Sequence, residues 1–267
     1  MKITVIQNKI HQTVDETIIG IDNLMKETQV GNTDFLVFSE MFTTPYESKH
    51  FLTHKQSLDG QVITYLSDLA KRYHSYVIGG SVPYEDQGKI YNTTFVFDRK
   101  GYIIGRYDKI HLFEIRYPDG KTFRESDVLE SGDKILTFDT EFGIMGVEIC
   151  FDIRYPELTT ILQRKGAVVV FVPAAFNTYT GPMHWQTTFR ARAIDNQIFM
   201  IGCSPSADSY GEYKVYGHSL VVDPLGNVLK ELDGDAGIFN LDIDLDLVDD
   251  VRESLPIVKN RRDLKDL

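Results

Sequence analysis

Three ionisable side chains stand at the boundaries of strand-like segments: Glu40 and Cys150 each follow an apolar run, and Lys109 stands between a strand-like segment and an apolar tripeptide. They are Glu40 in "DFLVFSEMF", Lys109 in "GRYDKIHLF" and Cys150 in "GVEICFDIRYPEL". A thiol can attack a carbonyl, a carboxylate can take up the thiol proton, and an ammonium group can stabilise the oxyanion that develops. Together these residue types predict amide hydrolysis through a thioester on Cys150, with Glu40 as the general base.

The position of each side chain predicts how its pKa is shifted. Glu40 is expected at the carboxyl end of a buried strand, where loss of water raises the pKa of a carboxyl group. Cys150 is expected where a strand turns into a helix, and backbone N–H groups and the Lys109 ammonium would there lower the pKa of its thiol. A second acid, Glu125 in "KTFRESD", can orient the lysine or relay a proton to the leaving ammonia.

Each of these residues also has a purely structural interpretation. Glu40 alone resembles a helix cap or a paired carboxylate, Lys109 an ordinary surface lysine, and Cys150 an inert core thiol. The catalytic hypothesis therefore depends on the three occurring together. Cys203, in "MIGCSPS", has no such candidate partner residues and is assigned no role.

The surrounding sequence predicts an α/β fold that can position these groups. Short, continuously apolar runs are typical of strands covered on both faces, and they occur at "KITVIQ", "DFLVFSE", "SYVIGGSVP", "TTFVFD", "IMGVEIC", "AVVVFVPAAF", "IFMIGCSP" and "HSLVVD". Helical periodicity covers residues 14–29 and 62–73. Turn residues predict hairpins at "FDRKGYIIG", "DTEFGIMG" and "VDPLGNVLKEL", so the sheets should be mixed. We expect one domain over residues 1–267, with a C-terminal extension from about residue 248 that forms a short helix and a charged tail.

Composition excludes several classes of function. The formal net charge is −11, so nucleic acids and anionic membranes would be repelled, and an anionic small substrate would need a local cationic pocket. Two cysteines and no long apolar segment predict a cytoplasmic protein. The histidines and glycines show no metal-binding spacing and no nucleotide-binding loop, so neither a metal nor a cofactor is expected.

The three motifs, in this order and at these separations, resemble those of the nitrilase, or carbon–nitrogen hydrolase, superfamily. The resemblance extends from "MKITVIQ" to "PIVKNRRDL". It implies a four-layer α-β-β-α sandwich with mixed sheets, which pairs through its outer helices as a homodimer. It also implies a Glu-Lys-Cys triad of Glu40, Lys109 and Cys150, with Glu125 as a second catalytic acid.

Within that superfamily the sequence is most similar to the omega-amidases, which hydrolyse the terminal amide of 2-oxoglutaramate and 2-oxosuccinamate. The stretches "PYESK", "KTFRESDVLESGD" and "AAFNTYTGPMHWQTTFRARAIDNQIF" support this likeness. The resemblance places the backbone N–H of Phe151 in the oxyanion hole and Tyr46 near the substrate. Phe113, just beyond the lysine, is expected to form an aromatic wall.

Alternatives remain open at this level. Deaminated glutathione amidases share the "TGPMHW" and "RARAI" signatures, and N-carbamoyl hydrolases and nitrilases use the same triad. A scaffold that has lost activity is disfavoured by the intact triad. A cysteine protease is disfavoured because no obvious histidine partner lies near the thiol, and a thiol oxidoreductase because there is no CxxC motif. Arg154 can bind a substrate carboxylate, but its separation from Glu157 favours an ordinary helical salt bridge.

Overall fold

A seven-stranded mixed sheet forms one half of the molecule. The computed structural model describes residues 1–262. The strands of this sheet are β1 (Lys2–Gln7), β2 (Phe35–Val37), β3 (Tyr76–Ile78), β4 (Val82–Asp86), β5 (Lys89–Phe97), β6 (Ile103–Asp108) and β15 (Gly237–Asp242). Their order is β15-β1-β2-β3-β5-β4, and β6 also pairs with β5. Only the pairs β1–β2 and β2–β3 are parallel.

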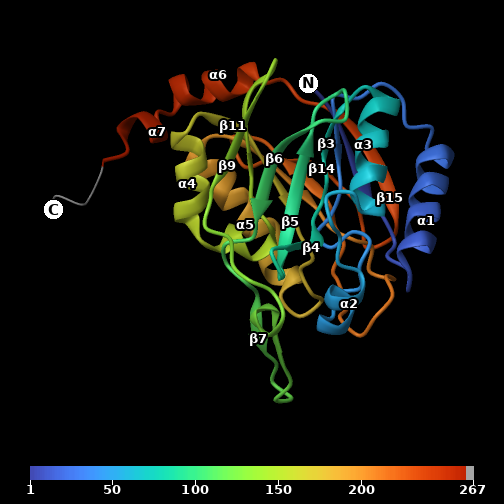
Figure 1. Cartoon of the computed structure of the whole chain (residues 1–267). Coiled ribbons are helices and arrows are strands. Elements are labelled where there is room, and N and C mark those ends of the chain that lie inside the picture. The colour runs from blue at the N-terminus through green and yellow to red at the C-terminus, as the bar shows by residue number, and fades with distance from the viewer. Residues whose placement is uncertain (263–267) are drawn as a thin grey trace.

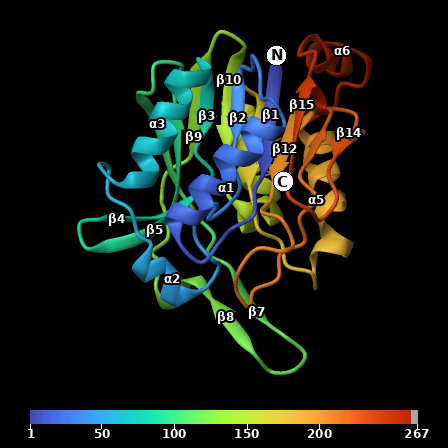
Figure 2. The same cartoon turned by 90° about the vertical axis from the view of Figure 1, so that its right-hand side faces the viewer.

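A six-stranded sheet forms the other half. It consists of β9 (Leu136–Thr140), β10 (Gly143–Val147), β11 (Ala167–Pro173), β12 (Phe199–Cys203), β13 (Leu220–Val222) and β14 (Val228–Glu231), in the order β14-β13-β12-β11-β10-β9. The three central strands are parallel and the outer pairs antiparallel. A separate hairpin of β7 (Glu114–Arg116) and β8 (Thr122–Arg124) projects from one end of the molecule (Figure 2).

Helices cover the outer face of each sheet, which gives the predicted α-β-β-α order (Figure 1). Helices α1 (Val14–Glu27) and α3 (Gln61–Tyr73) cover the first sheet, and α4 (Pro156–Arg164) and α5 (Gly181–Asn196) the second. Thr13 and Glu16 form a capping box at the start of α1, which satisfies backbone N–H groups that the helix itself leaves unpaired. The fold class expected from the sequence is therefore confirmed.

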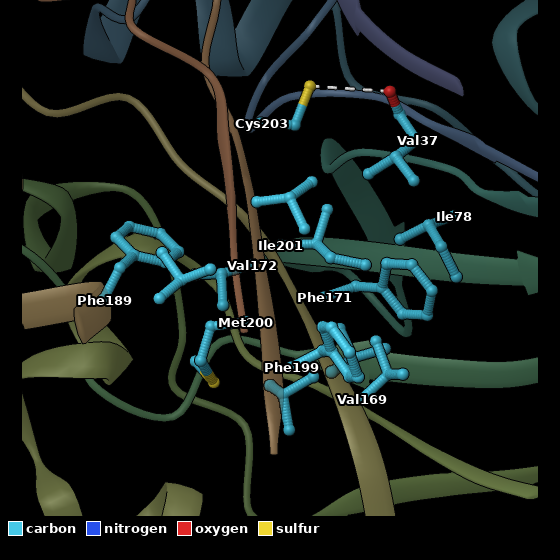
Figure 3. Packing of buried hydrophobic residues seen from close by; sticks show 14 of the residues in the cluster. Val37, Ile78, Val169, Phe171, Val172, Phe189, Phe199, Met200, Ile201 and Cys203 are labelled. Atoms are coloured by element: carbon cyan, nitrogen blue, oxygen red, sulfur yellow. Dashed lines mark hydrogen bonds between the residues drawn. The ribbon is translucent and has the colours of Figure 1, made fainter. Parts of the chain in front are cut away.

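The two sheets bury their inner faces against each other (Figure 3). Strand β2 is apolar throughout because both of its faces are buried. Phe35 and Val37 face the second sheet, whereas Leu36 packs with the helices on the other side. The Cys203 thiol lies in this layer and donates to the carbonyl oxygen of Val37 at 3.4 Å. It is a structural residue, as expected for a thiol that is fully buried.

The run "SYVIGGSVP" is not one strand, as the sequence predicted, but two. Strand β3 ends at Ile78 and β4 begins at Val82, and both pair with β5. Gly80 between them has φ +46°, and a Cβ atom there would collide with the carbonyl oxygen of Ser39. Only glycine allows this approach, which holds the loop after β2 against the strand break. The three predicted hairpins, in contrast, are all present as β5–β6, β9–β10 and β13–β14.

Short helices complete the chain. They are α2 (Ser48–Thr53), the 3₁₀ turns η1 (Glu125–Asp127) and η2 (Cys150–Arg154), and the C-terminal helices α6 (Asp246–Ser254) and α7 (Ile257–Asn260). The predicted C-terminal helix thus starts close to residue 248, and part of the predicted charged tail, residues 263–267, lies outside the described residues. No helix within residues 1–262 is long and apolar enough to cross a membrane.

Candidate active site

Four segments from both sheets bring the predicted catalytic residues to one buried point. Glu40 follows β2, Lys109 follows β6, Glu125 opens η1, and Cys150 opens η2 after β10. Three of these side chains are completely buried, and Cys150 is 5% exposed. The packing of one sheet on the other therefore brings together residues that are far apart in the sequence.

Cys150 lies on a sharp turn between strand and helix. Its φ is +47°, a conformation that residues other than glycine rarely adopt. Asp152 holds this turn, because its Oδ2 atom accepts from the backbone N–H of Ile149 at 3.1 Å. Its Oδ1 atom accepts from the backbone N–H of His111 at 2.9 Å. Asp152 thus fixes the thiol segment to the segment that carries Lys109.

Lys109 joins the two carboxylates. Its Nζ atom donates to Glu40 Oε1 at 2.7 Å and lies 2.8 Å from Glu125 Oε2. Glu125 also accepts from the backbone N–H of Phe113 at 2.6 Å. A buried ammonium with two carboxylate partners is held in one orientation, because a buried charge is costly unless it is paired.

Two further side chains complete the cluster. The Tyr46 hydroxyl lies 2.7 Å from Glu125 Oε1 and 3.1 Å from Glu40 Oε1, so this predicted substrate-binding residue directs its polar atom at the two predicted catalytic carboxylates. Asn92 on β5 contacts the same two oxygens and was missed by the sequence analysis. Its only signal was a polar residue in the otherwise strand-like "KIYNTTFVF".

Burial and neighbouring charges shift the pKa values of the side chains in this cluster. Burial raises the pKa of Glu40 against the opposing charge of Lys109, in the direction that the sequence predicted. Burial and the Glu40 carboxylate also raise the pKa of the Cys150 thiol, so the prediction of a lowered pKa was wrong. Burial and the Glu40 carboxylate together outweigh the Lys109 ammonium here, and the resting group is a neutral thiol. The same carboxylates, against the effect of burial, keep the Lys109 pKa high and the side chain charged.

A small pocket opens at the thiol. It is lined by Phe113, Cys150, Phe151, Arg154, Ala175, Phe176, Asn177, Thr180 and Tyr213. The predicted substrate-contacting residues Phe113 and Phe151 are thus both beside Cys150, with ring centroids 5.3 Å apart. Tyr46 does not line this pocket but a neighbouring one.

Arg154 is the cationic group of the pocket. Its guanidinium lies 4.7 Å from the ring centroid of Phe176, and Nη1 is 3.0 Å from His184 Nδ1. The expected salt bridge with Glu157 is absent from the described residues, as is any other carboxylate within 4.0 Å of the guanidinium. Arg154 points to the pocket because η2 ends before α4 begins, so the helical spacing that suggested the pair does not apply.

A second cavity, of about 380 Å³, adjoins the first and shares Asn177 and Tyr213 with it. Its walls come partly from the β7–β8 hairpin and include Lys121, Lys214 and Glu212. Within residues 1–262 no three side chains of His, Cys, Asp or Glu are grouped so as to hold a metal ion.

The α-β-β-α sandwich is that of the nitrilase fold. The sequence model of the family described as carbon–nitrogen hydrolase matches residues 2–253. The chain belongs to this family and is a carbon–nitrogen hydrolase.

Individual relatives agree with this placement. The chain is 38% identical over 248 residues to an omega-amidase of Saccharomyces cerevisiae, covering 91% of this chain and 84% of that protein. It is 36% identical over 261 residues to the human omega-amidase, covering 98% and 95%. The crystal structure of yeast Nit3, a member of branch 10 of the nitrilase superfamily, superposes with a TM-score of 0.87 at 34% identity, covering 98% and 97% of the two chains.

Proposed function

We propose that this protein is an omega-amidase that hydrolyses the terminal amide of a short 2-oxo dicarboxylic acid monoamide, such as 2-oxoglutaramate or 2-oxosuccinamate. The observation that supports this most directly is the pocket in which Arg154, a guanidinium with no carboxylate partner among the described residues, lies beside Cys150. A half-buried cation without an anion is costly, and a substrate carboxylate would supply one. The named omega-amidases at 36–38% identity support the same activity.

In the proposed reaction, Glu40 takes the proton of Cys150 as the sulfur bonds to the amide carbon. The carbonyl oxygen becomes an oxyanion, stabilised by Lys109 and by the backbone N–H of Phe151. Lys109 has a donor to spare, because its third contact, to Tyr46 Oη, is long at 3.4 Å. Collapse breaks the C–N bond, and Glu40 returns the proton to the leaving nitrogen, which departs as ammonia.

The second half of the reaction reverses the roles. A water molecule gives its proton to Glu40 and attacks the thioester carbon, and collapse breaks the C–S bond. The sulfur takes the proton back, which releases the acid and restores the neutral thiol. Glu125 holds Lys109 in place through both halves and has no direct proton transfer to make. A thiol with a raised pKa suits this scheme, because it ionises only as the base acts on it.

The adjoining cavity supports a second candidate, an amidase for deaminated glutathione. That substrate has a peptide tail which the small pocket cannot hold, whereas the second cavity of about 380 Å³ has room for it. Its lysines, Lys121 and Lys214, would face the terminal carboxylate.

We also propose that the protein acts in the cytoplasm as a homodimer, that residues 1–267 form one domain with a C-terminal extension, and that α4 and α5 form the dimer interface. Ile161 on α4 and Ile194 on α5 are 39% and 37% exposed, and Leu225 and Leu229 beside α5 are also exposed. Exposed apolar residues gathered on one face are typical of an interface between subunits.

Ammonia release from 2-oxoglutaramate by the purified protein tests the proposed function. Deaminated glutathione serves as the competing substrate, and Cys150→Ala, checked for folding by circular dichroism, as the blank. Faster, cysteine-dependent turnover of 2-oxoglutaramate is the expected result. A preference for deaminated glutathione would select the second candidate, and unchanged turnover by Cys150→Ala would disprove the thioester mechanism.

A further inference from the structure

Asn92 lies between the two catalytic carboxylates. Its Nδ2 atom is 2.8 Å from Glu40 Oε1 and 3.0 Å from Glu125 Oε1, and the side chain is completely buried. Its backbone carbonyl accepts from the backbone N–H of Lys109 at 2.9 Å. One residue of β5 therefore sets the position of all three charged groups.

The chemistry of the contacts fixes the orientation of the Asn92 amide. Both neighbouring atoms are carboxylate oxygens, which accept hydrogen bonds, so the NH₂ group must face them. Each of its two N–H bonds can then serve one carboxylate. This arrangement offsets the repulsion between two negative groups that are both excluded from water.

The hydrogen bonds on Glu40 are distributed unequally between its two oxygens. Oε1 is within hydrogen-bonding distance of Lys109 Nζ, Asn92 Nδ2 and Tyr46 Oη, at 2.7, 2.8 and 3.1 Å. Oε2 is equally buried and has no hydrogen-bond partner among the described residues. Because Oε1 is saturated, Oε2 is the oxygen left to accept a proton.

We propose that Asn92 is a positioning residue for the base: it holds Glu40 Oε1 and Glu125 Oε1 together so that Glu40 Oε2 stays directed at the Cys150 thiol. This inference rests on the proposed function in that it takes Glu40 as the base. Asn92 does not touch the substrate. It acts by fixing the rotamer of Glu40 and by stabilising its ionised form.

The proposal predicts a shift in a pH profile as well as a loss of rate. A hydrogen bond to the charged form of a carboxylate lowers its pKa, so removing the Asn92 donor should raise the pKa of Glu40. The acid limb of kcat/KM, below which the base is protonated, should then move to higher pH by about one unit. The maximal rate should fall about 10- to 100-fold, the range for a lost hydrogen bond to a charged group.

The experiment compares Asn92→Ala and Asn92→Leu with Thr94→Val. Asn92→Leu keeps the side-chain volume, so it remains informative if the smaller residue impairs folding. Thr94 lies two residues along β5, is completely buried, and bonds through Oγ1 to the carbonyl of Gly80 instead of to a carboxylate. Thr94→Val therefore removes a buried hydrogen bond from the same strand without touching the cluster.

Two readouts are measured over pH 5–9. The first is kcat/KM for amide hydrolysis, and the second is the rate at which iodoacetamide alkylates Cys150, followed by mass spectrometry of its peptide. Alkylation needs the base but no substrate, so it still tests Asn92 if no amide is turned over and the proposed function fails. The acid limb is expected to move upward in both Asn92 variants and to stay in place in Thr94→Val. An unmoved limb in the Asn92 variants, or an equal shift in Thr94→Val, would overturn the proposal.

Discussion

The Nζ atom of Lys109 lies 2.7 Å from Oε1 of Glu40, and both side chains are completely buried. The same ammonium is 2.8 Å from Oε2 of Glu125. One buried cation therefore balances two buried carboxylates, and the pKa of Glu40 is raised by burial and held down by Lys109. This relationship links the proposed catalytic base to the stability of the fold.

Replacing Lys109 by Met should destabilise the fold more at high pH than at low pH. The variant leaves two buried carboxylates without a counter-charge, which costs about 3–5 kcal/mol. Without Lys109 the pKa of Glu40 rises further, so at pH 5.5 protonation relieves part of the penalty, whereas at pH 8 the full penalty remains. Urea unfolding at the two pH values measures this.

The matched control is Lys55→Met, which breaks an exposed ion pair with Glu85 at 2.7 Å. Exposed pairs contribute little, so its free energy of unfolding should change by less than about 1 kcal/mol at both pH values. A Lys109→Met penalty that is the same at pH 5.5 and pH 8 would contradict the coupling.

Arg154→Met should affect carboxylated substrates selectively. If the guanidinium binds the substrate carboxylate, kcat/KM for 2-oxoglutaramate should fall about 100-fold, because truncating one partner of a buried charge pair is costly. A neutral amide such as butyramide should change by less than about threefold. Arg164→Met, an exposed arginine at the end of α4, is the control and should leave both values unchanged. Equal losses for both substrates would assign Arg154 a structural role instead.

Glu148→Gln should make stability less dependent on pH. Glu148 lies two residues before Cys150, is completely buried, and has no hydrogen-bond partner for either carboxylate oxygen among the described residues. Burial raises its pKa to about 8 from the ordinary value of 4.5. The native state therefore keeps a proton that the unfolded state loses, and stability decreases as the pH rises from about 4.5 to about 8.

The neutral glutamine should not cause this decrease in stability with rising pH. Its advantage in unfolding free energy over the native residue should grow by on the order of 3 kcal/mol between pH 5 and pH 8. Urea unfolding of both proteins at the two pH values gives the difference. A difference that does not vary with pH would show that Glu148 is ionised in the native protein.

Charges introduced on α4 and α5 should dissociate the proposed dimer. Ile161→Lys combined with Ile194→Lys places two charges on the proposed interface, where they would be desolvated on association. Sedimentation velocity should then show a monomer. Ile19→Lys on α1, at a site 60% exposed on the opposite layer, should leave the dimer intact. A monomeric Ile19→Lys variant, or a dimeric double variant, would place the interface elsewhere.

Much of the site was predictable because its residues lie where strands end. Glu40, Lys109 and Cys150 were each found from such a boundary, and the buried strands, the helices and the hairpins were found from their periodicity and turn residues. The strand break at Gly80 was not found. Its cause is the approach of Ser39, a residue on another segment, and local sequence does not record such an approach.

By itself, then, the sequence determined which chemistry the chain carries, because residue type and hydrophobic pattern are local properties. The tertiary structure decided how that chemistry is tuned. It brought Asn92 to both carboxylates and Arg154 into the pocket that Cys150 lines. It also raised the pKa of Cys150, where the expected turn and the Lys109 ammonium predicted the opposite. These outcomes depend on distances between strands far apart in the chain, and on the burial that their packing creates.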